Sequence, residues 1–124
     1  YMTGEEDGGF FNSVGGNEWA LDPESGTLWA IPDMGRGAWE NVTELDTGRP
    51  RWIAFLLADD TSPFDFDPDE ANGTEAAPLY LYIGRKKNNG DFLERNGLRD
   101  GKLFVWVSNH GTAPRSFSSG AARR

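Results

Sequence analysis

Adjacent carboxylates in a glycine-rich stretch are the first residues of this sequence that could do chemistry. Glu5 and Glu6 lie between Gly4 and the pair Gly8 and Gly9. Carboxylates are hard oxygen ligands for cations such as Ca²⁺, and glycine lets the backbone bend around a bound ion. The alternative is a solvated acidic segment that binds nothing.

Two further groups of charged residues have spacings that suit a binding site. Arg36 and Glu40 flank Trp39, so the arginine could bind an oxyanion and the carboxylate a metal ion. Asp59 and Asp60 follow an apolar run directly, and two adjacent acids are costly to bury without a cation. The alternatives are an ordinary ion pair in a loop and a polar strand end.

Acidic and basic segments later in the chain give weaker signals. Asp65, Asp67 and Asp69 begin like a calcium-binding loop, but Glu70 stands where that loop needs glycine. We expect an acidic surface loop there, with loose calcium binding as the alternative. Residues 85–87 are an Arg-Lys-Lys cluster that could hold a phosphate or neutralise the acidic loops.

Composition excludes several classes of site. The chain has 124 residues, no cysteine and a single histidine, so it has no thiolate metal site, no cysteine nucleophile and no histidine-rich zinc site. Its net charge is −8, and the acidic residues gather in the first two thirds, which disfavours nucleic acid as a partner. No apolar run is long enough to cross a membrane. The sequence begins with Tyr1 rather than methionine, so we expect a segment of something longer.

Short apolar runs bounded by turn residues predict β-strands. Residues 17–22 and 27–31 flank the turn 23–26 and predict a hairpin. Asp91 and Gly97 are the expected cap and stop of a single helical turn. Three further strands are predicted at residues 51–58, 79–83 and 102–108, the first of them buried on both faces.

The segments between these strands predict long loops. Glycines at residues 35, 37 and 48 argue against a regular element within residues 35–50, and residues 61–78 are strongly acidic. We therefore expect an all-β fold of antiparallel strands with long acidic loops. One to two blades of a β-propeller would occupy residues 1–108, and residues 109–124 would form a flexible basic tail.

Taken together and in order, these segments resemble the PhoX-type alkaline phosphatases. That family folds as a β-propeller and hydrolyses phosphate esters at a centre of iron and calcium. The similarity covers most of residues 1–108 and rests on the shared order of the motifs. The matching segments are residues 1–6, 35–41, 53–60, 78–86 and 93–98.

The resemblance implies roles for particular side chains. Glu40 and Asp59 are expected to be the catalytic carboxylates at the metal centre. Two residues depart from the family pattern: Gly4 stands in place of a cysteine that binds iron, and Trp39 in place of a histidine. Calcium is therefore the expected cofactor, and an intact iron centre is not expected. The implied metal ligands are Glu5, Glu6, Glu40, Asp59 and Asp60, and the implied phosphate-binding residues are Arg36 and Arg85.

Two functions of different classes follow from the sequence. The first is a fragment or divergent member of a metal-dependent phosphate-ester hydrolase, with negligible turnover by these 124 residues alone. The second is a non-catalytic scaffold subunit that docks on a larger assembly through exposed strand edges. A plain acidic calcium module is a third alternative. The expected partners are a phosphate ester or other protein subunits, and the resemblance implies a secreted or periplasmic location, with an organelle as the alternative.

Overall fold

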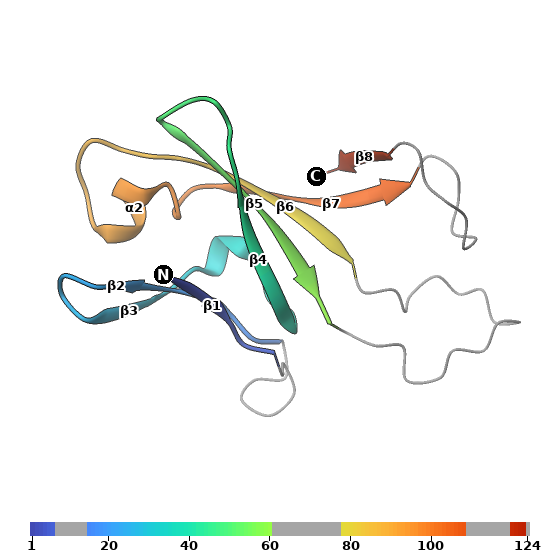
Figure 1. The fold of residues 1–124 in the computed structure, drawn as a ribbon, viewed down its shortest axis with the longest axis horizontal. Coiled ribbons are helices and arrows are strands. Elements are labelled where there is room, and N and C mark those ends of the chain that lie inside the picture. The colour runs from blue at the N-terminus through green and yellow to red at the C-terminus, as the bar shows by residue number, and fades with distance from the viewer. Residues whose placement is uncertain (7–14, 61–77, 109–119, 124) are drawn as a thin grey trace, which may run out of the picture.

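Two antiparallel β-sheets form the framework of the described chain. The computed structural model describes residues 1–6, 15–60, 78–108 and 120–123. In this part of the chain the strands are β1 (Met2–Gly4), β2 (Glu18–Asp22), β3 (Thr27–Ala30), β4 (Trp39–Leu45), β5 (Trp52–Asp59), β6 (Leu79–Arg85), β7 (Lys102–Ser108) and β8 (Gly120–Arg123). They form one sheet in the order β1-β2-β3 and another in the order β4-β5-β6-β7-β8 (Figure 1). The predicted all-β, antiparallel fold is confirmed.

The smaller sheet contains the predicted hairpin. Strands β2 and β3 are antiparallel, and Asp22 and Thr27 are partners next to the turn. The Asp22 carboxylate accepts hydrogen bonds from the Glu24 N–H and the Ser25 hydroxyl, which fixes the turn. Gly26 has a φ of 69°, a left-handed conformation that glycine adopts without strain.

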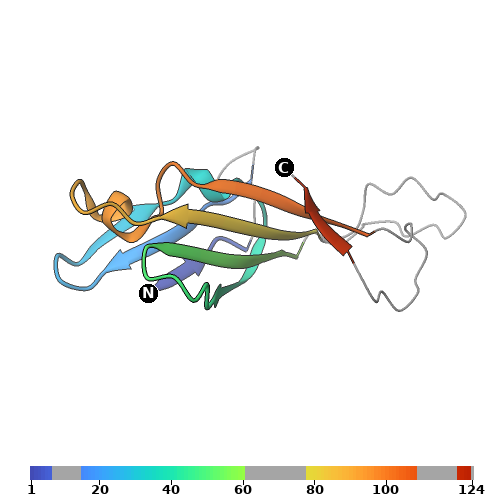
Figure 2. The ribbon, with the colours of Figure 1, turned by 90° about the horizontal axis from the view of Figure 1, so that it is seen from above.

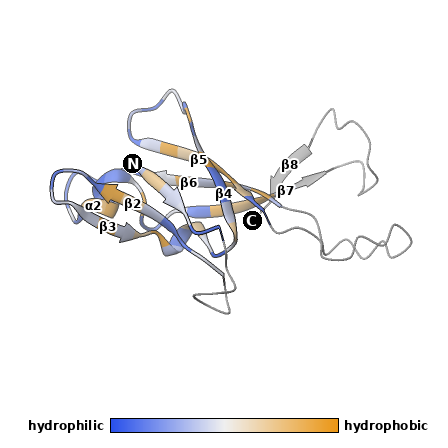
Figure 3. Ribbon diagram, turned by 60° about the horizontal axis from the view of Figure 1, so that its bottom comes forward, coloured by the Kyte–Doolittle hydropathy of each residue, from blue (hydrophilic) through white to orange (hydrophobic). Residues whose placement is uncertain are grey.

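The larger sheet has a buried inner face and a partly exposed outer face, because successive residues of a strand point to opposite sides. Phe55 and Tyr82 are cross-strand partners on the inner face, and both are buried. Leu56 and Leu81 are partners on the outer face, and both keep part of their surface exposed. Strand β5 is coloured as hydrophobic over much of its length (Figure 3). The strand expected to be buried on both faces is thus fully buried on only one.

Strand β4 corrects the prediction that residues 35–50 hold no regular element. It pairs with β5 along most of its length, with an irregularity between Trp39 and Asn41. The glycines that argued against a strand, Gly35, Gly37 and Gly48, flank β4 and do not interrupt it. Pairing with the strongly apolar β5 thus outweighs the weak local signal.

Hydrogen bonds join the two sheets at one corner. The Trp39 N–H donates to the Glu5 carbonyl over 2.9 Å, and Gly16 and Gly37 form an isolated antiparallel bridge. Between the sheets lies a core whose buried members are Ala20, Ile31, Met34, Trp39, Ile53, Phe55, Leu57, Tyr82, Leu93 and Leu98. The sheets do not close on one another within the described residues, so the assignment to propeller blades stays a prediction.

The predicted helical turn is present as α2 (Phe92–Asn96), which lies near the β2–β3 hairpin (Figure 1). Asp91 and Glu94 form a reciprocal capping box at its start, and Gly97 ends it with a φ of 75°. The Phe92 ring stacks on Trp29 of β3, with ring centres 6.0 Å apart. A 3₁₀ turn, η1 (Pro32–Met34), places Met34 in the core.

Several predictions fall wholly or partly outside the described residues. The acidic segment at residues 65–70 is among them, and the chain's single histidine, His110, also lies outside the described residues. Of the tail predicted at residues 109–124, the structure describes Gly120–Arg123, which pair with β7 as β8 (Figure 2). No helix in the described ranges combines the length and the apolar character that a membrane span needs.

Candidate functional site

Three carboxylates lie on or next to the strands that meet at one corner, β1, β2, β4 and β5. This region, called the carboxylate end below, contains Glu5, Glu18 and Asp59. Glu5 follows β1, Glu18 begins β2, and Asp59 ends β5. The hydrogen bond from the Trp39 N–H to the Glu5 carbonyl joins β4 to the end of β1, and the cross-strand pair of Trp39 with Asp59 joins β4 to β5. Strand β1 in turn pairs with β2.

Glu18 is the most unusual side chain of the carboxylate end. It is fully buried, and neither carboxylate oxygen has a hydrogen-bond partner among the residues that the structure describes. Burial raises the pKa of Glu18 from 4.5 to about 7, and the nearby Trp19 N–H opposes this shift only in part. A buried carboxyl group without a partner is costly, so it favours a proton or a bound cation.

Asp59 and Glu18 both lie close to Trp39. A Cβ atom placed on Gly37 would lie 2.8 Å from Oδ2 of Asp59 and 3.3 Å from the Trp39 ring. A Cβ atom on Gly4 would lie 2.9 Å from Oε1 of Glu18 and would collide with Cβ of Trp39. The two glycines therefore let the carboxylates approach the tryptophan closely. Nε1 of Trp39 is buried and has no hydrogen-bond partner among the described residues.

Tyr80 completes the surroundings of Asp59. Its ring meets Trp39 edge to face, with ring centres 5.5 Å apart. Burial and the negative charge of Asp59 both raise the pKa of Tyr80, so this hydroxyl keeps its proton at neutral pH. Asp59 is itself buried, at 9% exposure.

Glu5 is partly buried and is held by the backbone. One of its carboxylate oxygens accepts a hydrogen bond from the Asn17 N–H over 2.5 Å. A Cβ atom on Gly16 would collide with the Glu5 side chain, so glycine is needed there.

The other predicted site residues of this corner are exposed. Glu6, Glu40 and Asp60 all present their side chains to solvent. Glu40 lies at the irregularity of β4, next to the Trp39–Asp59 pair. Arg36 is exposed as well, and its guanidinium lies 3.4 Å from the Gly15 carbonyl. The structure therefore brings Glu5 and Asp59 to the same corner and leaves the other predicted residues on its rim.

Arg85 lies at the opposite end of the larger sheet. It is the cross-strand partner of Trp52, the first residue of β5, whereas Asp59 is the last residue. The two ends of β5 are about 23 Å apart at the usual rise per residue. Arg85 is therefore too far away to orient a phosphate bound at the carboxylate end.

Sequence reasoning missed Glu18. The apolar residues Trp19 and Leu21 suggest that their face of β2 is the buried one, yet both are only partly buried. The alternate residues Glu18 and Ala20 face the core. The available signal was the period of two that places Glu18 on the same face as Ala20, but a charged residue at a strand end is normally solvated.

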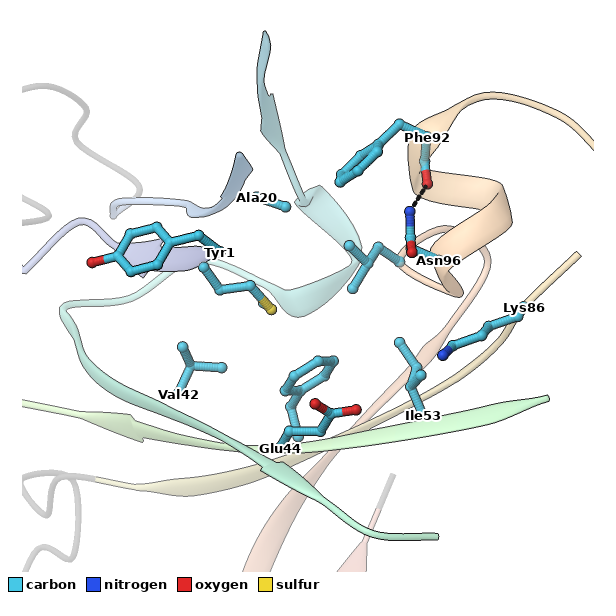
Figure 4. A pocket seen from close by; sticks show the side chains of 11 residues that line it. Tyr1, Ala20, Val42, Glu44, Ile53, Lys86, Phe92 and Asn96 are labelled. Carbon is cyan, nitrogen blue, oxygen red and sulfur yellow. Dashed lines mark hydrogen bonds between the residues drawn. The ribbon is translucent and has the colours of Figure 1, made fainter. Parts of the chain in front are cut away.

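A hollow lies between the sheets, nearer to the start of β5 than to its end. Its volume is about 450 Å³. Apolar residues such as Met2, Ile53 and Phe55 line it, and Glu44 and Lys86 add opposite charges (Figure 4). Glu18 and Asp59 do not line this hollow, so it is separate from the carboxylate end.

The chain was compared with models of protein families, with curated proteins and with solved structures, and none of the three comparisons finds a match.

Proposed function

We propose that the carboxylate end binds a divalent cation, preferably Ca²⁺, and that the chain is a segment of a metal-dependent phosphate-ester hydrolase of the PhoX type. The observation that supports this proposal best is the Glu18 carboxylate, which is fully buried with neither oxygen hydrogen-bonded in the described chain. A cation supplies the charge compensation that this group lacks.

The donor set fits calcium better than iron. Glu5, Glu18 and Asp59 offer hard oxygen atoms, and calcium accepts carboxylates, backbone carbonyls and water in variable geometry. A cysteine at position 4 does not fit, because its Cβ would collide with Cβ of Trp39. Iron held by a thiolate at this position is therefore not part of the proposal.

These residues alone are not expected to turn over a phosphate ester. In the described part of the chain, no three histidine or acidic side chains gather closely enough to enclose a metal ion. Catalysis needs the cation, the phosphate and the attacking oxygen in one place, and Arg85 lies at the other end of the sheet. Further ligands would come from outside the described residues.

Isothermal titration with Ca²⁺ in neutral buffer tests the cation site. Wild-type protein should bind Ca²⁺, and Glu18→Gln should weaken binding about tenfold or more, since a charged ligand is lost. Glu24→Gln is the matched control, because Glu24 is exposed in the β2–β3 turn. Equal binding by all three proteins would show that Glu18 holds no cation. A parallel assay with a chromogenic phosphate ester should give no turnover by the chain alone.

A second candidate function is docking on another β-sheet, and the outer face of the larger sheet favours it. Leu56, Leu81 and Phe104 form a cross-strand row on that face. Trp106 and Leu79 are 45% and 38% exposed beside a hollow of about 130 Å³. Apolar patches of this kind commonly mark interaction surfaces. The occupant that we propose is an antiparallel sheet with an apolar face, like the sheet already packed on the inner side.

Sedimentation of the chain over a range of concentrations tests this second function, because the chain itself offers such a sheet. Wild-type protein should associate with increasing concentration, and Leu81→Arg should remain monomeric. The matched control is Leu28→Arg, because Leu28 is 51% exposed on β3, away from the outer face. Association that is the same for wild type and Leu81→Arg would exclude the outer face as the surface.

A further inference from the structure

We infer that the end of the larger sheet opposite the carboxylates is a binding site for a doubly charged oxyanion such as a phosphate monoester. A hollow of about 500 Å³, called the basic basin below, lies there. Its charged lining residues are Arg51, Arg85, Lys86, Lys87, Arg99 and Asp100. The inference goes beyond the proposed cation site, because no residue of the basin belongs to the carboxylate end.

The fold holds the cations of the basin in place. The Lys86 N–H donates to the Arg51 carbonyl over 2.9 Å, which continues the pairing of β5 with β6. The Arg51 guanidinium donates to the Asn88 amide oxygen over 3.2 Å. The Arg85 guanidinium lies over the Trp52 ring, 5.8 Å from its centre. Arginines that are positioned before a ligand arrives lose less entropy on binding.

Only part of the positive charge is neutralised. Lys87 pairs with Glu94 and Asp100, and Arg99 pairs with Asp91. Arg51, Arg85 and Lys86 form no ion pair with a carboxylate among the described residues. The basin therefore keeps an excess of positive charge in a chain whose net charge is −8.

The kinds of cation favour an oxyanion with at least two acceptor oxygens. A guanidinium group is a planar donor fork that matches phosphate geometry, and a lysine adds a mobile point charge. Arg51 directly precedes β5, Arg85 ends β6 and Lys86 follows it, and the backbones of Arg51 and Lys86 are hydrogen-bonded. A tetrahedral dianion in the basin can thus meet cations from the adjoining ends of β5 and β6. The phosphate could be free or part of a larger molecule, since the recognised group is the same.

Calorimetric titrations with inorganic phosphate and with capped phosphoserine test the inference and separate these two sources. Wild-type protein should bind at least one of them, and the double variant Arg51→Gln/Arg85→Gln should bind about tenfold more weakly, since two charge-assisted donors are lost. Side-chain Nε–Hε NMR signals of Arg51 and Arg85 should shift on titration. Tighter binding of phosphoserine would identify a monoester as the ligand, and tighter binding of inorganic phosphate would identify the free ion.

Arg49→Gln/Arg95→Gln is the matched control, because it removes the same two charges from exposed arginines that do not line the basin. Equal loss in this control and in the double variant would mean that net charge alone attracts the anion, and would overturn the inference. No binding of either phosphate compound by wild-type protein would overturn it as well. Neither outcome bears on Ca²⁺ binding, which Glu18→Gln tests separately.

A third variant should change the affinity for phosphate in the opposite direction. Asp100→Asn removes a carboxylate that competes for Lys87, so phosphate should bind a few-fold more tightly. Asn tolerates the left-handed backbone at this position, where φ is 59°. A capped hexaglutamate peptide is the last ligand to be titrated, as a model of an acidic protein segment. If it binds more tightly than phosphoserine and is equally sensitive to the double variant, the ligand is an acidic segment and the inference is wrong.

Discussion

The two ends of strand β5 carry opposite charges in opposite environments. Near its last residue, Asp59, a buried acidic corner also contains Glu18 and Trp39. At its first residue, Arg85 covers the Trp52 ring and is exposed to water with Arg51. The same strand therefore joins a desolvated acidic corner to a solvated basic basin.

This difference shows what each end requires from a ligand. Glu18 has no hydrogen-bond partner among the described residues, and an ionised carboxyl group in that position destabilises the fold. Folding is therefore coupled to the binding of a proton or a cation at Glu18. An exposed guanidinium group keeps its hydration, so the basic basin can remain empty at little cost. A ligand should thus stabilise the acidic corner strongly and the basic basin weakly.

The largest expected effect is a loss of stability with rising pH, caused by Glu18. Its pKa in the folded protein, about 7, lies above the ordinary value of 4.5, so stability is fully present below pH 4.5 and is lost as the pH rises to 7. The free energy of unfolding, measured with urea in a chelator, should fall by about 3 kcal/mol across this window. Glu18→Gln should remove most of this fall, and an equal fall in that variant would assign it to other groups.

A smaller loss of stability is expected when a larger residue at position 4 crowds the packing around Glu18. Gly4→Ala places a methyl group where Cβ of Trp39 already lies, so the free energy of unfolding should fall by about 2 kcal/mol. Gly26→Ala is the control, because it meets no atom within 4 Å and costs about 1 kcal/mol for its left-handed backbone alone. If Gly4→Ala is no worse than this control, the corner has room for a larger residue.

A single buried hydrogen bond supports the basic end. The Tyr82 hydroxyl donates to the Gly97 carbonyl over 3.1 Å, and this contact holds the turn that leads to Arg99. Tyr82→Phe should lower the free energy of unfolding by about 1 kcal/mol, because it leaves the carbonyl without this donor. Hydrogen exchange of the Leu98 amide should speed up in the variant. Unchanged exchange would mean that the turn is held by packing alone.

The smallest effect is expected from the exposed ion pairs. Lys87 donates to Glu94 and Asp100, and these contacts raise the pKa of Lys87 and lower those of the two acids. All three groups are solvated, so Lys87→Gln should hardly move the midpoint of thermal unfolding. A clear fall in the midpoint at low ionic strength that vanishes in salt would show that the basin depends on this lysine.

Local signals predicted much of the fold. The turn of the first hairpin, the apolar run of β5, and Asp91 and Gly97 at the ends of α2 each act within a few residues, so the sequence displays them directly. Strand β4 was missed because glycines flank it and few of its own residues are apolar. Its strand conformation depends on pairing with β5, which a local pattern within residues 35–50 does not report.

The two candidate sites also differ in how much of each could be predicted from local sequence patterns. The basic basin was partly visible as consecutive residues, since Arg85, Lys86 and Lys87 are adjacent. The predicted carboxylates Glu5 and Asp59 do share a corner, but Glu18 was not predicted because its burial depends on contact with Gly4 and Trp39. No local pattern reports such a contact, since it is made between strands of two sheets.

Direct titration of the Glu18 carboxyl carbon by ¹³C NMR, with and without Ca²⁺, tests the central claim that this buried group holds a cation. In a chelator, the signal should titrate with a pKa of about 7. In saturating Ca²⁺ the apparent pKa should fall by at least about one pH unit, because the cation binds only the ionised form. A titration curve that Ca²⁺ leaves unchanged would contradict the account.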